Sequence, residues 1–217
     1  MNAFSFEKAV IEQVELSHWK DSGVEVFVKR EDLSDEIVSG NKWRKLKYNI
    51  DQFLLQGNEK VLTFGGAFSN HLHAVARVGQ LMKIPTIGVV RGERSDRLSP
   101  TLLDCEKMGM QLHFVSRELY SEKEAKGFQQ DLRDEYGNIF VIPEGGNNYR
   151  GVIGCQEILK AVPDSFTDIF CSLGTGTTFA GLITSGFEAR FHGVSALKGG
   201  FHEKEVFDFI DNNIGPV

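Results

Sequence analysis

The sequence predicts an open α/β fold, with mostly parallel sheets and helices on both faces. Short runs rich in β-branched and aromatic residues alternate with helix-like stretches along most of the chain. The strand-like runs are almost wholly apolar, which is typical of parallel strands that are buried on both faces. No repeat of fixed period and no Pro-rich linker interrupts this alternation.

The predicted elements follow one another closely. The first strand is predicted at residues 24–29, and the first helix, at 43–56, has an apolar stripe formed by Trp43, Leu46, Ile50 and Leu54. Further strands are predicted at residues 61–64, 86–91, 111–115, 139–143, 168–173 and 192–197. Further helices are predicted at residues 71–82, 101–109, 121–136, 149–162 and 177–187. Each crossover helix has to bury its stripe on the sheet, so both sheet faces are expected to be covered.

Composition favours a protein that binds a small molecule. The 217 residues carry a net charge of −6, and the basic residues are scattered apart from one stretch at residues 39–48. A nucleic-acid footprint or a polybasic membrane patch needs clustered Lys and Arg, so neither is expected. No segment reaches the roughly 18 consecutive apolar residues of a membrane span. We therefore expect no nucleic-acid partner and no membrane partner.

The cysteines and the first residues indicate a cytoplasmic protein. Cys105, Cys155 and Cys171 are odd in number, far apart and outside any C-x-x-C pair. This pattern argues against a disulfide framework and against a thiolate zinc site. Residues 1–20 carry acids and no long apolar run, so no targeting segment is expected there.

Three junctions between a predicted strand and the next helix are rich in glycine and small polar residues. Ligands of open parallel sheets bind at such strand ends. The first junction has Ser69 and Asn70 at the start of a helix, which fits a plain cap or an anion site. The second junction is interpreted most simply as an ordinary turn. The second junction contains Gly145, Gly146, Asn147 and Asn148.

The third junction fits a phosphate cradle, because glycines let the backbone wrap an anion and threonine hydroxyls donate hydrogen bonds. A P-loop needs a lysine after its last glycine, and here Phe179 and Ala180 follow the threonines. The dinucleotide fingerprint G-x-G-x-x-G would need its third glycine at Phe179. A single phosphate monoester therefore remains as the ligand. The third junction contains Gly174, Thr175, Gly176, Thr177 and Thr178.

The basic stretch SGNKWRKLKY, residues 39–48, supplies cations for such a phosphate. Lys42 and Lys45 lie three apart on the predicted helix and share a face. Two ammonium groups on one face repel unless they point to water, hold an anion between them, or one of them is neutral. A phosphate held by Lys45 and the third junction, beside a reactive amine on Lys42, is the arrangement that pyridoxal phosphate requires.

Four segments, in this order along the chain, resemble the family of 1-aminocyclopropane-1-carboxylate deaminase and D-cysteine desulfhydrase. They are SGNKWRKLKY, TFGGAFSNH, VIPEGGNNYRGVIG and CSLGTGTTFAGL. The resemblance implies a two-domain tryptophan-synthase-β-like fold with pyridoxal phosphate as cofactor. It implies a large cofactor domain formed by residues 1–46 and 150–217, C-terminally truncated and so incomplete relative to the family, and a small α/β domain formed by residues 47–149.

The resemblance also implies roles for individual residues. Lys42 would form the Schiff base with the cofactor, and Lys45 would hold the phosphate. Asn70 would bond the pyridoxal 3-oxygen, and Ser69, Asn70 and His71 would receive the substrate carboxylate. His71 stands where the deaminases have an amide, and it forms no metal site with His73, because residues two apart on a helix face different ways. The rest of the phosphate site would be Gly174, Thr175, Gly176, Thr177 and Thr178.

The function implied is a lyase or hydrolase that acts on 1-aminocyclopropane-1-carboxylate or D-cysteine and releases ammonia and a 2-oxo acid. Two alternatives are a pyridoxal-phosphate-binding protein without turnover and a nicotinamide-dependent oxidoreductase. The family's C-terminal region supplies the group at the pyridine nitrogen and the tyrosines near the ring, and none of the four tyrosines here matches that role. An incomplete sheet exposes an edge, so a homodimer or larger assembly is expected.

Overall fold

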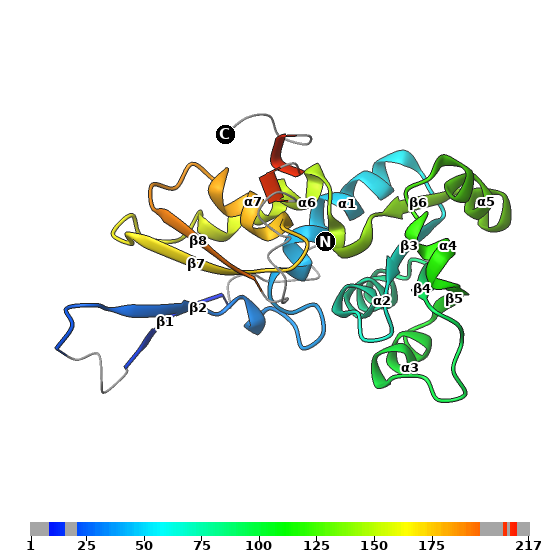
Figure 1. The fold of residues 1–217 in the computed structure, drawn as a ribbon, viewed down its shortest axis with the longest axis horizontal. Helices are drawn as coiled ribbons and strands as arrows, with labels where there is room; N and C mark the ends of the chain where they lie inside the picture. Colours follow the sequence, from blue (N-terminus) through cyan, green and yellow to red (C-terminus); the bar gives the residue numbers. More distant parts are fainter. Residues whose placement is uncertain (1–8, 16–20, 196–205, 208, 212–217) are drawn as a thin grey trace.

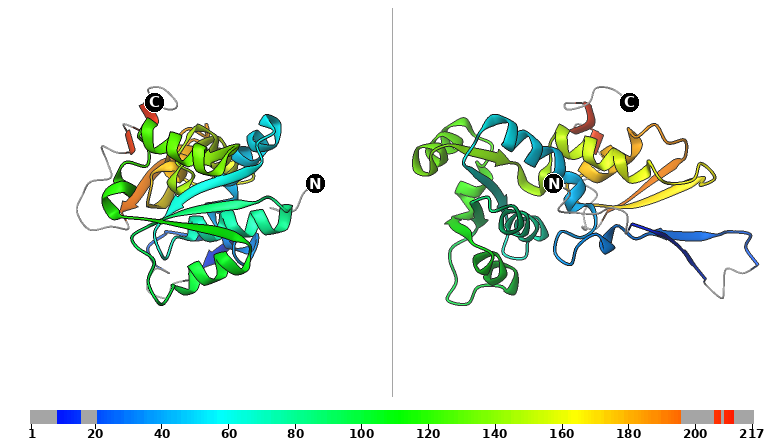
Figure 2. Two further views of the ribbon diagram at one scale, coloured as in Figure 1. Left: turned by 90° about the vertical axis from the view of Figure 1, so that its right-hand side faces the viewer. Right: turned by 180° about the vertical axis from the view of Figure 1, so that it is seen from behind.

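The computed structural model describes residues 9–15, 21–195, 206–207 and 209–211 (Figures 1 and 2). Two groups of strands lie on opposite sides of a central set of helices. The described strands are β1 (Ile11–Val14), β2 (Val26–Lys29), β3 (Lys60–Gly65), β4 (Thr86–Arg91), β5 (Met110–Val115), β6 (Ile139–Ile142), β7 (Asp168–Leu173) and β8 (Arg190–Ser195). The described helices are α1 (Asn41–Gln56), α2 (Asn70–Met82), α3 (Pro100–Lys107), α4 (Arg117–Ser121), α5 (Lys126–Tyr136), α6 (Tyr149–Gln156) and α7 (Thr177–Ile183), with the 3-10 turns η3 (Glu31–Leu33), η4 (Glu144–Gly146) and η5 (Glu157–Leu159).

The larger group of strands is a four-stranded sheet with the order β5-β4-β3-β6. All of its pairs are parallel, and Val61 of β3 lies between Thr86 of β4 and Phe140 of β6. Parallel pairing brings the carboxyl ends of these strands to one edge, where the loops into α2 and α6 begin. The predicted open, mostly parallel sheet is confirmed.

Helices cover both faces of this sheet, as predicted. Val61 of β3 enters an apolar cluster with side chains of α1, α2 and α3, including Leu46 and Val75. The next residue, Leu62, points to the other face and packs in a second cluster with α5 side chains such as Leu132. Each fully buried side chain of this kind stabilises the fold by about 1.5–3 kcal/mol. The sheet is therefore a buried layer that fixes the loops at its edge.

Three central helices pack against one another with almost no space between their backbones. A Cβ atom at Gly154 of α6 would lie only 1.8 Å from the backbone oxygen of Arg44 in α1. A Cβ atom at Gly181 of α7 would lie 2.4 Å from the Cβ atom of Cys155 in α6. The two glycines therefore set the spacing of α1, α6 and α7, which lie between the two groups of strands (Figure 1).

The smaller group of strands contains β7 and β8, which pair in parallel with Asp168 opposite Arg190. The last predicted strand begins two residues earlier than expected, and its residues 196–197 lie outside the described residues. β1 and β2 form an antiparallel ladder in which Ile11 lies opposite Lys29. β2 was predicted and β1 was not, because the exposed pair at residues 12–13 gives β1 no apolar pattern.

Three helices differ from the prediction, and the one expected at 177–187 ends as α7 at Ile183. The helix expected at 121–136 is replaced by α4, which begins earlier and ends at Ser121, and by α5, which begins after a turn at Lys126. The Ser116 hydroxyl caps α4 by accepting from the Leu119 N–H at 3.2 Å, and Gln129 of α5 donates to the Lys123 carbonyl in the turn at 2.6 Å. The helix expected at 149–162 ends after α6 and continues only as the short turn η5.

The division into two domains remains a prediction. Its first boundary, between residues 46 and 47, falls inside the continuous helix α1, and its second falls in the first turn of α6. None of the helices in the part of the chain that the structure describes is long and apolar enough to cross a membrane.

Candidate active site

The first turn of α1 carries the candidate reactive lysine. Gly40 has a φ of 62°, a left-handed conformation that suits glycine, and α1 begins at the next residue. Lys42 is half-buried, and its Nζ atom donates to the Asn41 side-chain oxygen at 3.0 Å. Burial lowers the pKa of the Lys42 amine below its usual value, and the thiol of Cys155 opposes this shift. The neutral amine, which is the nucleophilic form, is thereby favoured.

Lys45 lies one turn further along α1 and is buried, with 4% of its surface exposed. Its Nζ atom donates to the Thr175 hydroxyl at 3.3 Å. Burial lowers the pKa of Lys45 to about 8, the Cys155 thiol opposes this shift, and the charge of Lys42 adds to it. Within the described residues neither lysine forms an ion pair with a carboxylate, so an anion would improve the surroundings of both.

The predicted phosphate loop connects β7 to α7 and is tied to α1. Gly176 has a φ of 77°, and the hydroxyls of Thr175 and Thr177 lie 3.1 Å apart. The side-chain amide of Asn41 donates to the Thr178 hydroxyl at 2.6 Å. A Cβ atom at Gly174 would meet no atom within 4 Å, so the start of the loop faces open space. Lys45 and Asn41 of α1 are therefore both hydrogen-bonded to threonines of the loop.

The second junction packs directly on this loop and is more than an ordinary turn. A Cβ atom at Gly145, which has a φ of 69°, would lie 2.7 Å from the Thr175 methyl group. The Thr177 hydroxyl donates to the Asn147 side-chain oxygen at 2.7 Å. Asn148 caps α6 by accepting from the Gly151 N–H at 2.9 Å. The junction thus supports the threonine loop from the sheet edge.

The first junction places Ser69 and Asn70 at the start of α2. The Ser69 hydroxyl accepts from the Leu72 N–H at 3.2 Å, so this side chain acts as a helix cap. Asn70 is exposed and lines a cavity together with Lys42. Of the two predicted polar side chains, only Asn70 is therefore directed to the same space as the candidate lysine.

His71 is turned away from that cavity into the sheet edge. Its Nε2 atom lies 2.9 Å from the Thr63 hydroxyl oxygen, and that hydroxyl donates to the Ile142 carbonyl at 2.8 Å. A hydroxyl has one proton, so Nε2–H of His71 donates to Thr63. Burial, together with the charges of Lys42 and Lys45, lowers the pKa of His71 to about 3. The ring is neutral, and its one N–H group is already used.

The cavity beside Lys42 has a volume of about 400 Å³ and includes residues to which the sequence analysis gave no role. Glu36 and Ile37 lie in the loop from η3 to α1, where no motif distinguishes them, whereas residues 39–41 belong to the SGNKWRKLKY stretch. His73 comes from α2, and its Nε2 atom lies 3.9 Å from a carboxylate oxygen of Asp104. The additional lining residues are Glu36, Ile37, Ser39, Gly40, Asn41 and His73.

In the described part of the chain, no three His, Cys, Asp or Glu side chains lie together as ligands for a metal ion. His71 and His73 have different neighbours, Thr63 and Asp104.

The thiols are poor nucleophiles, because burial raises the pKa of Cys155 to about 11 and that of Cys105 to about 12.

The donors of the site fit a phosphorylated aldehyde. A buried ammonium, two threonine hydroxyls and an open glycine loop can hold a phosphate dianion, and an amine with a lowered pKa lies within the same helix turn. This site, in an open parallel α/β fold, defines a pyridoxal-phosphate-binding protein. Residues 10–196 match the family described as pyridoxal-phosphate dependent enzyme, and the chain therefore belongs to that family. Pyridoxal phosphate is the cofactor of this family.

Individual relatives share the two activities of the family that the sequence resembles. A protein of Thermotoga maritima, named as a candidate 1-aminocyclopropane-1-carboxylate deaminase, is 36% identical over 168 residues, which are 74% of this chain and 53% of the relative. The bifunctional D-cysteine desulfhydrase/1-aminocyclopropane-1-carboxylate deaminase of Arabidopsis thaliana mitochondria is 29% identical over 205 residues, which are 86% of this chain and 50% of the relative. The chain spans about half the length of these relatives.

A solved structure supports the fold assignment. The crystal structure of a 1-aminocyclopropane-1-carboxylate deaminase homologue matches with a TM-score of 0.77 and 26% identity. The match covers 94% of this chain and 65% of that chain. The predicted fold of this enzyme family is therefore confirmed for the described residues.

Proposed function

We propose that the chain is a pyridoxal-phosphate-dependent lyase that removes ammonia from 1-aminocyclopropane-1-carboxylate or D-cysteine and releases a 2-oxo acid. The observation that carries this proposal is the Lys42 amine, which has a lowered pKa and lines a cavity together with Asn41. Asn41 in turn donates to Thr178 of the threonine loop at 2.6 Å. Family membership and the names of the relatives support the same reaction class.

Two expectations from the sequence are corrected by the comparisons. The names of the relatives fit a lyase, so the hydrolase class is dropped. The family match also removes the nicotinamide-dependent oxidoreductase, which had only the parallel sheet and the glycine loops in its favour.

Each residue of the site has a task in this proposal. When bound, the cofactor supplies an aldehyde that bonds to an amine and a conjugated ring that takes up an electron pair from the substrate. Lys42 supplies the amine, and Lys45, Thr175 and Thr177 hold the phosphate. The Lys42 Nζ atom, once free, moves a proton at the substrate, because its lowered pKa lies nearer to neutral pH.

The substrate carboxylate is assigned to the start of α2. The N–H of the His71 ring is used by Thr63, so the ring cannot donate to a carboxylate. Asn70 and the free backbone N–H groups of the first turn of α2 remain as donors, and they favour an anion. Ser69 contributes by capping this turn and holding it in place.

Product analysis tests the proposal and separates the two substrates. D-Cysteine loses its α-proton and eliminates sulfide to give pyruvate and ammonia, whereas 1-aminocyclopropane-1-carboxylate has no α-proton and gives 2-oxobutyrate. Purified protein with pyridoxal phosphate is incubated with each substrate, and sulfide and both 2-oxo acids are measured against a Lys42→Ala control. Absence of both products, with the cofactor still attached to Lys42, would identify a binding protein without turnover and refute the proposed reaction.

We also propose that the chain forms a homodimer or larger assembly in the cytoplasm. Phe170 of β7 is 70% exposed and Val194 of β8 is 56% exposed, so this small sheet presents apolar surface. The three cysteines are free, which is compatible with a reducing compartment. Light scattering of the purified chain tests the assembly, and a well-behaved monomer would count against it.

A further inference from the structure

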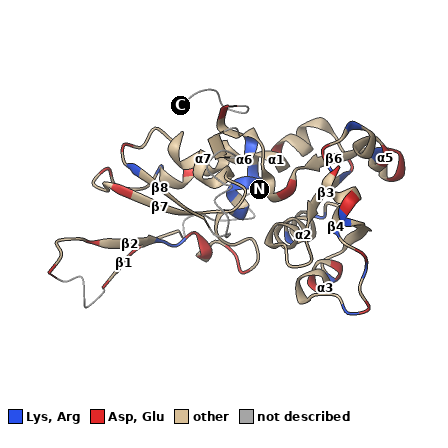
Figure 3. Ribbon diagram, viewed as in Figure 1, with Lys and Arg blue, Asp and Glu red and all other residues tan. Residues whose placement is uncertain are grey.

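Two cations of the basic stretch point away from the cavity and lie in a separate ionic network. Arg44 has only 8% of its side chain exposed, and Lys47 has 31%. A buried guanidinium is costly unless it is paired and hydrogen-bonded. In Figure 3 blue gathers at the start of α1, and elsewhere Lys and Arg are scattered along the ribbon among Asp and Glu.

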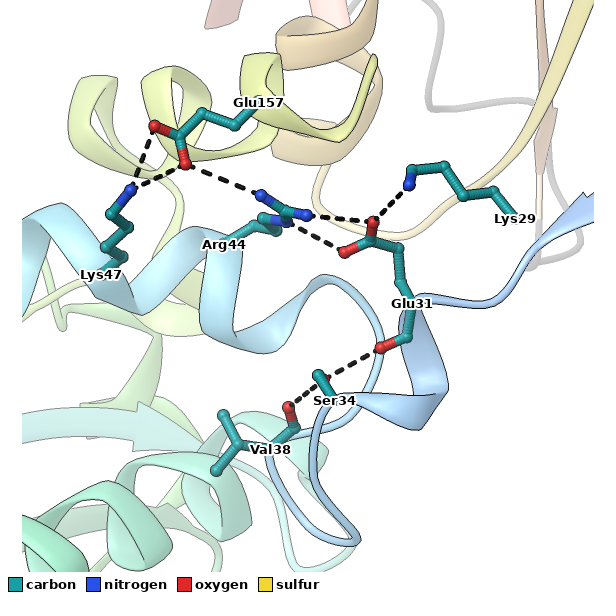
Figure 4. Close-up of polar contacts among 7 residues, drawn as sticks. All are labelled: Lys29, Glu31, Ser34, Val38, Arg44, Lys47 and Glu157. Carbon is teal, nitrogen blue, oxygen red and sulfur yellow. Dashed lines mark hydrogen bonds and ion pairs between the residues drawn. The ribbon is translucent and has the colours of Figure 1, made fainter. Parts of the chain in front are cut away.

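Arg44 is held between two carboxylates from distant parts of the chain (Figure 4). Its Nε and Nη2 atoms donate to the two carboxylate oxygens of Glu31 at 2.9 and 3.1 Å. Its Nη1 atom lies 3.6 Å from a carboxylate oxygen of Glu157. This bidentate pair fixes the guanidinium in one orientation, because two of its N–H groups donate to the same carboxylate. η3, α1 and η5 are thereby joined at one side chain.

Glu157 connects the network to the next turn of α1. Lys47 donates to its two carboxylate oxygens at 2.8 and 3.1 Å, and the Tyr48 hydroxyl donates at 2.6 Å. Burial opposes ionisation of Glu157, but the hydrogen bonds from Lys47 and Tyr48 outweigh it and lower its pKa. Lys29 lies 3.3 Å from Glu31 at the outer end. Both carboxylates are therefore charged partners of the α1 cations.

The backbone is fixed at the same residue. A Cβ atom at Gly154 would lie 1.8 Å from the Arg44 backbone oxygen, so α6 lies directly against α1 at this point. Arg44 is thus held through its side chain by Glu31 and Glu157 and through its backbone by α6. Lys42 is two residues away on the same turn of α1, so its backbone cannot shift unless this turn moves.

Other charged and titratable groups also surround Lys42. Lys45 follows on α1, and the charges of both lysines act on the neutral ring of His71 in α2. The Cys155 thiol of α6 acts on both lysines. Glu36 and His73 line the same cavity. None of these groups belongs to the network, so a change in the network alters the field at Lys42 while they stay in place.

We propose that Glu31 and Glu157 are positioning residues for the reaction proposed above: by binding Arg44 and Lys47 they orient the first turn of α1 toward the cavity and cancel two positive charges near Lys42. The inference rests on the proposed function for its purpose, but its electrostatic part concerns Lys42 alone. A network with a purely structural role would also stabilise the fold. The test therefore has to separate an electrostatic effect on the Lys42 amine from a loss of stability.

The sign of the electrostatic effect provides this separation. Glu157→Gln removes a negative charge and leaves the α1 cations less compensated, which lowers the pKa of Lys42 further. Arg44→Met removes a positive charge and leaves the carboxylates uncompensated, which raises it. One charge on the order of 10 Å away shifts a pKa by about half a unit at an effective dielectric constant of about 40. Loss of structure alone would move both variants in the same direction.

The experiment is competitive labelling of the cofactor-free 217-residue chain with acetic anhydride, followed by peptide mass mapping. The rate of Lys42 acetylation is measured against pH, and the midpoint of its rise gives the pKa of the amine. The matched control is Glu106→Gln in α3, which breaks an ion pair with Arg94. In this pair the Arg94 Nη2 atom lies 2.9 Å from a carboxylate oxygen of Glu106. If Arg44→Met does not fold, Lys47→Met carries the same predicted sign and removes a more exposed cation.

We expect the Lys42 midpoint to fall by about half a pH unit in Glu157→Gln, to rise by a similar amount in Arg44→Met or Lys47→Met, and to stay in Glu106→Gln. Unchanged midpoints, or shifts of one sign in all network variants, would reduce the network to a structural role and overturn the inference. Cofactor capture by Lys42, measured in parallel by borohydride trapping, tests the proposed function separately. Its absence in the unmodified chain would refute that function and leave the pH result standing.

Discussion

The two faces of α1 treat the same kind of residue in opposite ways. On one face Lys42 and Lys45 have no carboxylate partner within the described residues and lie beside a cavity and a threonine loop. On the other face Arg44 and Lys47 are fully engaged by Glu31 and Glu157. Four cations that are close in sequence therefore have two different environments, because the helix directs them to opposite faces. One face lies at a site where no described carboxylate pairs with the lysines, and the other lies in a network that contains two carboxylates.

The largest difference between the faces is expected for covalent capture of the cofactor. Lys42→Ala should abolish the visible absorption band that forms with pyridoxal phosphate, because no other amine of the described residues lines the cavity with Asn70. Lys47→Ala should keep the band, since Glu157 still has Arg44 and Tyr48 as partners. Absorption spectra of both variants with added cofactor provide the check. A band of full intensity in Lys42→Ala would contradict the assignment of the two faces.

The network face should be the more sensitive one to a small change in backbone packing. Gly154→Ala places a Cβ atom against the Arg44 backbone oxygen, and neither backbone can yield easily, so we expect a loss of about 3 kcal/mol or more in the free energy of unfolding. Gly127→Ala in α5 is the matched control, because its Cβ atom would meet nothing within 4 Å. This control should stabilise by about 0.5–1 kcal/mol. Urea unfolding measures both, and equal effects would show that the close contact does not exist.

On the site face, the buried Lys45 should lower the stability of the cofactor-free chain and strengthen phosphate binding. Lys45 is buried, and burial lowers its pKa to about 8, so the folded state binds this proton less well than the unfolded state. Lys45→Met should therefore stabilise the cofactor-free chain at pH 7 by about 1–3 kcal/mol and weaken phosphate binding at least tenfold.

The pH dependence of the same variant sharpens the prediction. In the unmodified chain the buried ammonium of Lys45 lowers the free energy of unfolding by its full amount below about pH 8. This loss disappears as the pH rises from there to the usual lysine pKa of 10.5. The gain from Lys45→Met should shrink over this range. Lys107→Met, with 74% of its side chain exposed, is the control and should stay within about 0.5 kcal/mol at both pH values. Urea unfolding at pH 7 and pH 10 decides, and a destabilised Lys45→Met at pH 7 would contradict the burial argument.

The smallest effect concerns binding of a simple phosphate monoester, such as glycerol phosphate, to the cofactor-free chain. The second proton of a phosphate monoester leaves at a pH of about 6, so the ligand is a dianion at neutral pH. Lys45 loses its charge as the pH rises through about 8, so affinity should fall severalfold between pH 7 and pH 9. Isothermal titration measures it. Affinity that rises with pH would place the phosphate away from Lys45.

The sheet and the lysine site could be predicted because their signals are local. The strand at 86–91 agrees with the structure residue for residue, since a short apolar run bounded by polar residues is visible in the sequence itself. The three-residue spacing of Lys42 and Lys45, and the glycines and threonines at 174–178, are equally local. These signals sufficed to bring the cations and the loop together.

The remaining features depend on contacts between distant segments. Glu31 and Glu157 partner Arg44 from 13 residues before it and 113 residues after it, and no pattern in either segment indicates this. β1 forms only because β2 offers a ladder for an otherwise polar segment. Glu36 and His73 reach the cavity through the fold, and the use of the His71 N–H group by Thr63 needed the geometry of the sheet edge. Such pairings become visible only in three dimensions.

The central claim is that Lys42, alone among the four cations of the basic stretch, holds the cofactor. The most direct test is borohydride reduction of the purified chain with pyridoxal phosphate, followed by peptide mass mapping of the label. We predict one label on Lys42, with Lys45 and Lys47 unmodified at stoichiometric cofactor. A label spread over exposed lysines, or placed on Lys47, would contradict the division of α1 into a cofactor face and a network face.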